Sequence, residues 1–258
     1  MLVDFSEITI YEVLALALST IAILIPLIQY FWRKWVIKPI LIYLPTGRGF
    51  LYNNRSGSYI HIEGVFEAKN KPISVKNIEL KVIRLKDEKV LNLKWSTFSS
   101  PVSQQIVGNY ASITETAHPF RIEADSIVCA FTEFADFYNS FYKTFQPYYD
   151  ALTETANRVC SPDLPYGQAY PKYISNDSYL AAKSVLEKEL FWEIGQYKVV
   201  LKAEYGKKFV DFSYEFSVNQ DDYERVKANL IETLLVPLKR IYGLPLSMQT
   251  VQIELREK

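Results

Sequence analysis

The residues best suited to chemistry in this chain are its cysteines and histidines, of which there are two each. Cys129 could act as a nucleophile with His118 as its base, because such partners meet in space rather than in sequence. Asp125 or Asp136 would then orient the imidazole. In the other reading Cys129, which lies in an apolar stretch, is a buried and inert thiol. We favour the inert thiol and predict no catalytic residue.

Motifs for metals and cofactors are absent from the sequence. His61 and His118 are too few for a histidine-rich metal centre, and neither lies near a second ligand in sequence. There is no glycine-rich nucleotide motif, no HExxH and no GxSxG. Gly47-Arg48-Gly49 beside Pro45 is typical of a turn. The sequence therefore predicts no metal and no cofactor.

The longest uncharged stretch is Val13 to Trp32, whose twenty residues are enough to cross a bilayer as a helix. Acidic residues precede it and basic residues follow it: Asp4, Glu7 and Glu12 before, and Arg33, Lys34, Lys38 and Arg48 after. Positive charge marks the cytoplasmic side, so this order predicts a single-pass protein with its N-terminus outside and its body in the cytoplasm. A signal peptide would show the opposite order of charge.

Aromatic and basic side chains at the end of the span predict a membrane interface, because amphipathic rings settle at the headgroup level. These interface residues are Tyr30, Trp32, Arg33, Lys34, Trp35 and Lys38. Pro26 is tolerated inside a membrane helix. A core helix of a soluble protein would instead show a polar side, which the few polar residues of the span do not make. Membrane lipid is therefore the first predicted partner.

The part of the chain after the span is close to neutral. All 29 basic residues follow Trp32, whereas three of the 29 acidic residues precede it, which leaves 29 basic against 26 acidic and a formal charge of +3. So small an excess argues against nucleic-acid binding. Two cysteines are too few for a disulfide framework. We divide the chain into an anchor, residues 1–36, and one cytoplasmic domain, residues 37–258.

Apolar and polar residues alternate on both sides of a helical segment, which predicts antiparallel strands. The predicted strands cover residues 40–44, 58–68, 78–82, 91–95, 120–122, 197–205, 212–218 and 251–255. The predicted helices cover residues 125–146 and 178–190, both within an insertion of residues 124–192, and a late segment capped by Asn219. Strands and helices do not alternate regularly, so a β-sandwich is favoured over a parallel sheet.

The segment GQYKVVLKAEYGKKFVDFSYEFSV, residues 195–218, resembles the last hairpin of immunoglobulin-like or arrestin-like sandwiches, where Gly-x-Tyr opens the penultimate strand. The resemblance covers this hairpin alone and names no specific family. It implies a mainly β fold with α additions. Because many functions share such sandwiches, it implies no activity.

The strongest feature of the body is its run of aromatic residues from Phe131 to Tyr149. Steps of three and four place one stripe on the predicted helix, namely Ile127, Phe131, Phe134, Tyr138, Phe141, Phe145 and Tyr148. This stripe can pack as core. Phe137, Tyr142 and Tyr149 lie outside it and indicate a surface that meets a protein partner.

Charge is also uneven along the body. Residues 69–94 hold eight basic residues against three acidic ones. Such a face could lie on anionic lipid headgroups, or it could simply be a solvated strand face. The sequence thus predicts a membrane-anchored, non-enzymatic binding or scaffold protein. The alternative is a membrane-anchored, cysteine-dependent hydrolase that uses Cys129 and His118.

Overall fold

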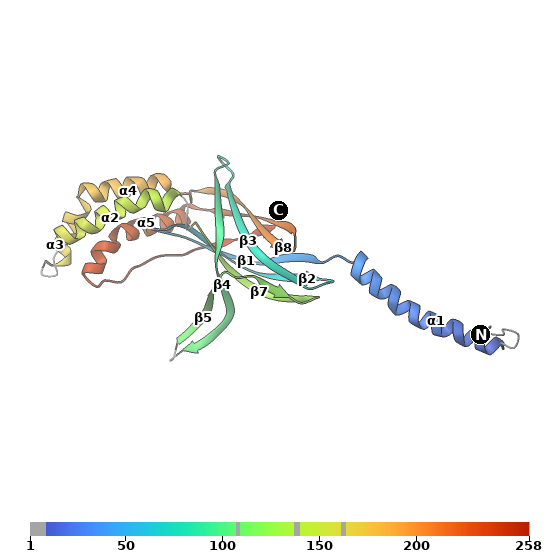
Figure 1. Cartoon of the computed structure of the whole chain (residues 1–258). Coiled ribbons are helices and arrows are strands. Elements are labelled where there is room, and N and C mark those ends of the chain that lie inside the picture. The colour runs from blue at the N-terminus through green and yellow to red at the C-terminus, as the bar shows by residue number, and fades with distance from the viewer. Residues whose placement is uncertain (1–8, 107–108, 137–139, 161–163, 258) are drawn as a thin grey trace.

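The computed structural model describes residues 9–106, 109–136, 140–160 and 164–257. In this part of the chain, alternating side chains build one antiparallel sheet that is nearly closed into a barrel (Figure 1). Its strands are β1 (Ile40–Asn54), β2 (Gly57–Lys69), β3 (Ile73–Arg84), β4 (Val90–Ile106), β5 (Asn109–Thr116), β6 (Phe120–Ile122), β7 (Ser126–Ala135), β8 (Gly195–Tyr205), β9 (Lys208–Val218), β10 (Val251–Glu254) and β11 (Arg256–Glu257). The mainly β class is confirmed. The immunoglobulin-like sandwich is not, because the described strands all belong to one sheet.

The order of the main path is β10-β1-β2-β7-β4-β3-β8-β9-β11, while β5 pairs with β4 and β6 with β3. The two ends of this path are joined by residues 251–257, here called the closing segment. Gly49 of β1 lies opposite Ile253 of β10, and Arg256 of β11 lies opposite Glu215 of β9. Between them Leu255 is buried, and its N–H donates to the carbonyl of Gly47 at 2.9 Å. One short segment therefore pairs with both edges of the sheet.

The core fills the inside of this sheet. Along β8, Tyr197, Val199, Leu201 and Ala203 are buried while the residues between them are partly exposed, as the period of two requires. The predicted hairpin is confirmed, with Tyr205 opposite Lys208 across its turn. Burial of a valine or leucine side chain contributes on the order of 1.5–3 kcal/mol to the free energy of folding, relative to exposure.

Four helices lie together at one end of the sheet (Figure 1). They are α2 (Ser140–Val159), α3 (Tyr166–Ile174), α4 (Asp177–Glu189) and α5 (Gln220–Ile241). Asn176 caps α4 by accepting a hydrogen bond from the N–H of Ser178, and Asn219 forms a capping box with Asp222 at the start of α5. The predictions of a helix over 178–190 and of a cap at Asn219 are confirmed. Pro237 lies inside α5 and does not end it.

The predicted helix over residues 125–146 is wrong. Residues 126–135 form β7, where Phe134 lies opposite Ile60 on one neighbour and Trp95 on the other. Helix α2 begins only at Ser140 and runs through Pro147 to Val159. The helical segment between β7 and β8 therefore starts after residue 136 and not at 124. Steps of three and four between large apolar residues also occur in a strand when both of its faces are partly covered, as in β7.

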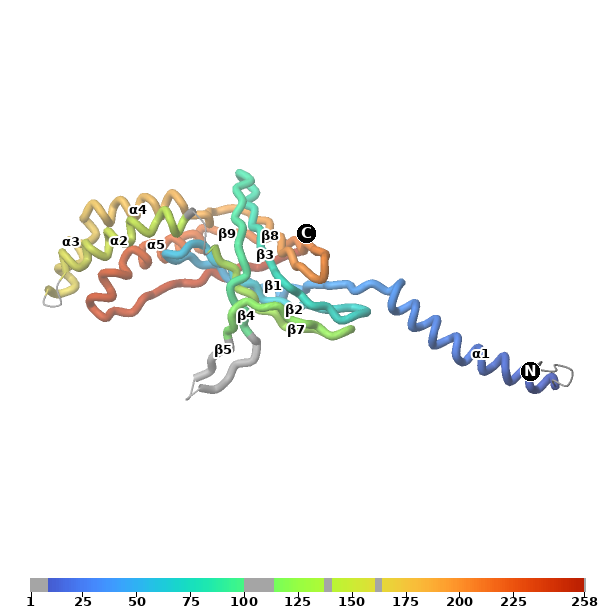
Figure 2. The backbone as a smooth tube through the Cα atoms, in the orientation of Figure 1, coloured from blue at the N-terminus to red at the C-terminus, as the bar shows by residue number. Residues whose placement is uncertain are grey.

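Helix α1 (Ile10–Phe31) stands away from the body, as both views show (Figures 1 and 2). None of its residues is buried. With the π-helical turn η1 (Trp32–Val36), it is long and apolar enough to cross a membrane by length and composition. Hydrogen bonds join the segment that follows α1, here called the base of the helix, to the turn between β2 and β3. There Lys71 Nζ donates to the carbonyl of Lys34 at 2.9 Å, and Asn70 Nδ2 donates to that of Lys38 at 3.1 Å.

Candidate ligand pocket

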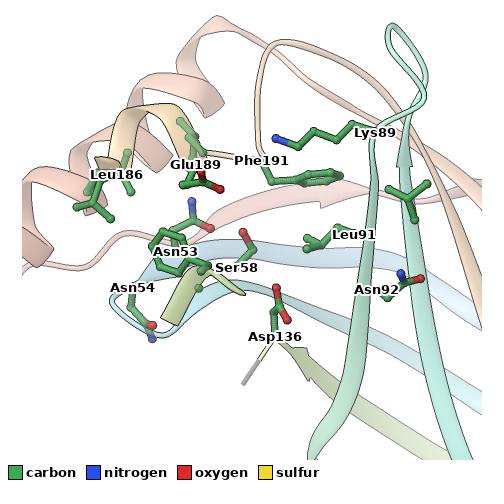
Figure 3. A pocket seen from close by; sticks show the side chains of 15 residues that line it. Asn53, Asn54, Ser58, Lys89, Leu91, Asn92, Asp136, Leu186, Glu189 and Phe191 are labelled. Carbon is green, nitrogen blue, oxygen red and sulfur yellow. The ribbon is translucent and has the colours of Figure 1, made fainter. Parts of the chain in front are cut away.

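A cavity of about 350 Å³ lies where the helices meet the end of the sheet (Figure 3). One wall comes from the turn between β1 and β2, a second from the start of β4, and a third from the end of α4. The lining residues are Asn53, Asn54, Gly57, Ser58, Lys89, Val90, Leu91, Asn92, Asp136, Phe141, Leu186, Glu189, Leu190, Phe191 and Leu230. Besides Gly57, seven of these residues are polar or charged and seven are apolar, so polar groups and apolar walls face the same cavity.

Most polar groups of this pocket come from the sheet and its turns, whereas Glu189 comes from the end of α4. Asn53 and Ser58 face each other across the β1–β2 pair, and Asp136 follows the last residue of β7 (Figure 3). Asn53 is only 4% exposed, and within the described residues its Oδ1 has no hydrogen-bond partner. Buried polar atoms are normally paired. An unpaired acceptor and a carboxyl group that line the same cavity are compatible with a ligand that donates hydrogen bonds.

Two local features hold the turn between β1 and β2: a hydrogen bond and a glycine conformation. Asn54 Oδ1 accepts a hydrogen bond from the N–H of Ser56 at 2.7 Å, which holds the turn. Gly57 has φ +125°, a conformation that favours glycine, and a Cβ there would contact Asp136 and Phe141. The turn thereby brings the polar side of the pocket close to the first turn of α2.

Burial raises the pKa of Asp136 to about 6. Such a carboxyl group is largely ionised at neutral pH at a cost in stability. It would interact well with a positively charged or hydrogen-bond-donating ligand.

Asp136→Asn should stabilise the unliganded protein at pH 7.5 by about 1 kcal/mol. Because the folded-state pKa is raised, the stability that Asp136 contributes is complete below about pH 4 and is lost as the pH rises through 6. The gain from asparagine should therefore shrink at pH 4.5. Melting of the full chain in detergent at the two pH values measures it. Asp211→Asn, at an exposed carboxyl group on β9, is the matched control; an equal gain at both pH values would contradict the assignment.

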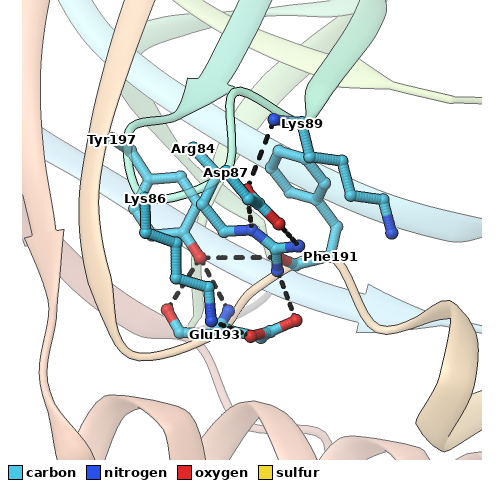
Figure 4. Close-up of polar contacts among 7 residues, drawn as sticks. All are labelled: Arg84, Lys86, Asp87, Lys89, Phe191, Glu193 and Tyr197. Atoms are coloured by element: carbon cyan, nitrogen blue, oxygen red, sulfur yellow. Dashed lines mark hydrogen bonds and ion pairs between the residues drawn. The ribbon is translucent and has the colours of Figure 1, made fainter.

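The wall formed by Phe191 is held by a charged cluster around Arg84 (Figure 4). Arg84 is 3% exposed and pairs with Asp87 at 2.6 Å and with Glu193 at 2.5 Å. Its Nη1 also donates to the carbonyl of Phe191 at 3.0 Å. Lys86 adds a second ion pair to Glu193. The cluster joins the turn between β3 and β4 to the segment that enters β8.

The structure does not bring together the residues weighed for a hydrolase. Cys129 is exposed on β7, opposite Val65, so the prediction that this thiol is buried is wrong. His118 Nδ1 bonds the carbonyl of Thr116 at 2.9 Å, whereas Asp125 Oδ1 accepts from the N–H of Asn70 at 3.0 Å. Asp136 lies at the far end of β7, in the pocket. Within the described residues no hydrogen bond or ion pair joins these four, and no group of three ligating side chains is placed to hold a metal ion.

The aromatic residues assigned to a partner surface lie in different settings. Phe137 lies outside the described residues. Tyr142 is exposed on α2, whereas Tyr149 packs against the core with the guanidinium of Arg55 5.0 Å from its ring centroid. Phe145 of the predicted stripe is buried. Of the two described candidates, Tyr142 is thus the more exposed.

The predicted membrane-interface residues lie where α1 meets the body. Trp32 and Trp35 are exposed. Lys34 Nζ lies 5.5 Å from the ring centroid of Tyr30 and 6.0 Å from that of Trp35. Arg33 lies in the same π-helical turn, and Lys38 follows it. The structure therefore groups the basic and aromatic residues at one end of the apolar helix.

Sequence reasoning missed the pocket itself. Its residues come from the β1–β2 turn, from β4 and from α4, which are far apart along the chain. The one local signal is Asn53-Asn54 followed by Gly57, which is typical of a turn and not of a binding site.

Comparison with known proteins gives no family. No family model and no curated protein matches the chain. Among solved structures, one from a study of glycolipid glycan hydrolysis by a family 123 glycoside hydrolase from Clostridium perfringens aligns with 9% identity and a TM-score of 0.30. The alignment covers 69% of this chain and 27% of that chain. A likeness at this level carries no argument about function.

Proposed function

We propose that this chain is a membrane-anchored, non-enzymatic binding protein that holds a β-rich body at the cytoplasmic face of the membrane. The observation that carries the proposal is helix α1, which has 22 residues, none of them buried. Apolar surface in water costs roughly 25 cal/mol per Å², so a helix of this length is stable when surrounded by lipid. The basic residues at its body-side end support the cytoplasmic orientation.

The binding part of the proposal rests on the pocket. Its buried acceptors, Asn53 and Asp136, and its apolar walls fit a small molecule with an amino group and an apolar portion. Such a molecule should raise the melting temperature of the wild-type chain but not that of Asp136→Asn. The exposed Tyr142 on α2 supports a second contact of the helical layer, with a protein partner.

The native cysteines allow a direct test of the anchor. Cys129 is exposed on the body and Cys160 is buried, so Cys129 reports the side of the membrane on which the body lies. In intact cells an impermeant maleimide should label Ser6→Cys but not Cys129. After permeabilisation it should label both. Cys129→Ser is the control that identifies the body signal.

Two outcomes would contradict this proposal. Labelling of Cys129 in intact cells would mean that the body lies outside. Release of the full chain from membranes by alkaline carbonate would mean that α1 does not span the bilayer.

A further inference from the structure

Three segments far apart in sequence meet at the end of the barrel next to α1. They are residues 67–76, 121–126 and 204–208, here called the anchor-facing end. The strand register fixes them, since Ala68 lies opposite Ser126, and Val75 lies opposite Tyr205. In addition, Lys76 Nζ donates to the carbonyl of Gly206 at 2.8 Å. Both turns point toward the base of α1 (Figure 2).

Positive charge dominates this end. Its three segments hold six basic and four acidic residues. Three of the carboxylates are engaged: Glu67 pairs with Lys69, Glu123 pairs with Arg121, and Asp125 accepts from the backbone of Asn70. Within the described part of the chain, Lys71, Lys76, Lys207 and Lys208 have no carboxylate partner in an ion pair.

Large apolar side chains are also exposed at this end. Phe209, the first residue after the β8–β9 turn segment, is 59% exposed, and Ile127 at the start of β7 is 62% exposed. Lys202 Nζ lies 4.4 Å from the ring centroid of Phe209. Exposed apolar residues next to unpaired lysines are the composition of surfaces that lie on anionic membranes.

The connection to the anchor is short. Only residues 37–39 separate η1 from β1, and three extended residues reach at most about 11 Å. The bond from Lys71 to the carbonyl of Lys34 fixes the β2–β3 turn beside the end of the helix. A bilayer crossed by α1 would therefore place its headgroups within reach of both turns.

We propose that the anchor-facing end docks on the anionic leaflet of the membrane that α1 crosses. This inference rests on the proposed function. Lys71, Lys207 and Lys208 contact lipid headgroups, while Phe209 and Ile127 enter the boundary between headgroups and acyl chains. The body is then held in one orientation, and helices α2 to α5, which lie at the end of the sheet opposite to α1 (Figure 1), are directed away from the membrane.

The test uses the full chain in bilayers of phosphatidylcholine with and without phosphatidylserine. The exposed native Cys129 is replaced in the variant Cys129→Ser, and Ile127→Cys carries a bimane fluorophore. Spin-labelled headgroups serve as the quencher. We expect strong quenching of the bimane in bilayers that contain phosphatidylserine. In bilayers of phosphatidylcholine alone the quenching should be much weaker. High salt should reduce it, because screening weakens contacts of lysine with lipid.

Charge reversal provides the matched comparison. Lys207→Glu with Lys208→Glu should lower the ratio of docked to undocked protein by on the order of tenfold or more, since each lysine near an anionic surface is worth about a factor of five. Lys172→Glu with Lys188→Glu, exposed on α3 and α4, makes the same change of charge at the far end and should have no effect.

The outcomes separate the two proposals. Equal quenching with and without phosphatidylserine, or an equal loss in both charge-reversed pairs, would overturn the docking surface while leaving the anchor in place. Absence of quenching in a chain that resists carbonate extraction would also overturn the docking surface. Release of the chain by carbonate would instead contradict the proposal that α1 spans the membrane.

Discussion

Replacing Gly64 by alanine is expected to destabilise the body by about 3 kcal/mol. Gly64 lies in β2, and an added Cβ would lie inside the contact distance of the Tyr43 ring. That ring is buried and is packed against Phe66 and Tyr214, at centroid distances of 4.7 Å and 6.1 Å. Either the ring would have to leave these contacts or the backbone of β2 would have to shift.

Chemical unfolding of the full chain, followed by circular dichroism in detergent, measures this loss. In a Tyr43→Ala background the same change at Gly64 should cost less than about 1 kcal/mol, because the clashing ring is gone. Gly167→Ala on α3 is the matched control, since its Cβ would meet no atom within 4 Å. A cost at Gly64 that is independent of Tyr43 would show that the close contact is not the cause.

Arg84→Met should destabilise the protein by roughly 2 kcal/mol. The buried carbonyl of Phe191 would lose the 3.0 Å hydrogen bond from Arg84 and keep the longer one, at 3.4 Å, from the hydroxyl of Tyr197. Methionine has an apolar side chain of similar shape to the arginine stem but carries no charge. Arg256→Met is the control, since Arg256 pairs with Glu254 at 2.7 Å on the surface and such pairs contribute little. Urea unfolding of both variants measures the difference. Equal effects would mean that the burial of Arg84 is unimportant.

The same cluster predicts an acid-dependent loss of stability. A hydrogen bond from Arg84 lowers the pKa of Asp87 to about 2. A lowered folded-state pKa contributes stability above the ordinary value near 4, and this contribution is lost as the pH falls toward 2. The melting temperature of wild type should therefore fall more steeply across this range than that of Arg84→Met.

The strands that bury one face could be predicted from sequence because their pattern is local. The hairpin of β8 and β9 and the cap at Asn219 are examples. Strand β7 could not be predicted in this way, because Phe131 and Phe134 are three residues apart and fit a helical period as well. The pocket depends on which turns meet in space. Asn53 and Asp136 come together only through the pairing of β1, β2 and β7.

Closure of the sheet by residues 251–257 has a consequence for the order of events during synthesis. Leu51 of β1 pairs with Val251, so the outer edge of β1 stays open until about two hundred further residues have been made. Helix α1 leaves the ribosome long before that point. In the membrane-anchored protein proposed above, α1 would enter the bilayer first and the barrel would be completed afterwards, with an unpaired strand edge in the interval. Such edges pair readily with other chains, so the outer edge of β1 is open to pairing with another chain until residues 251–257 have been made.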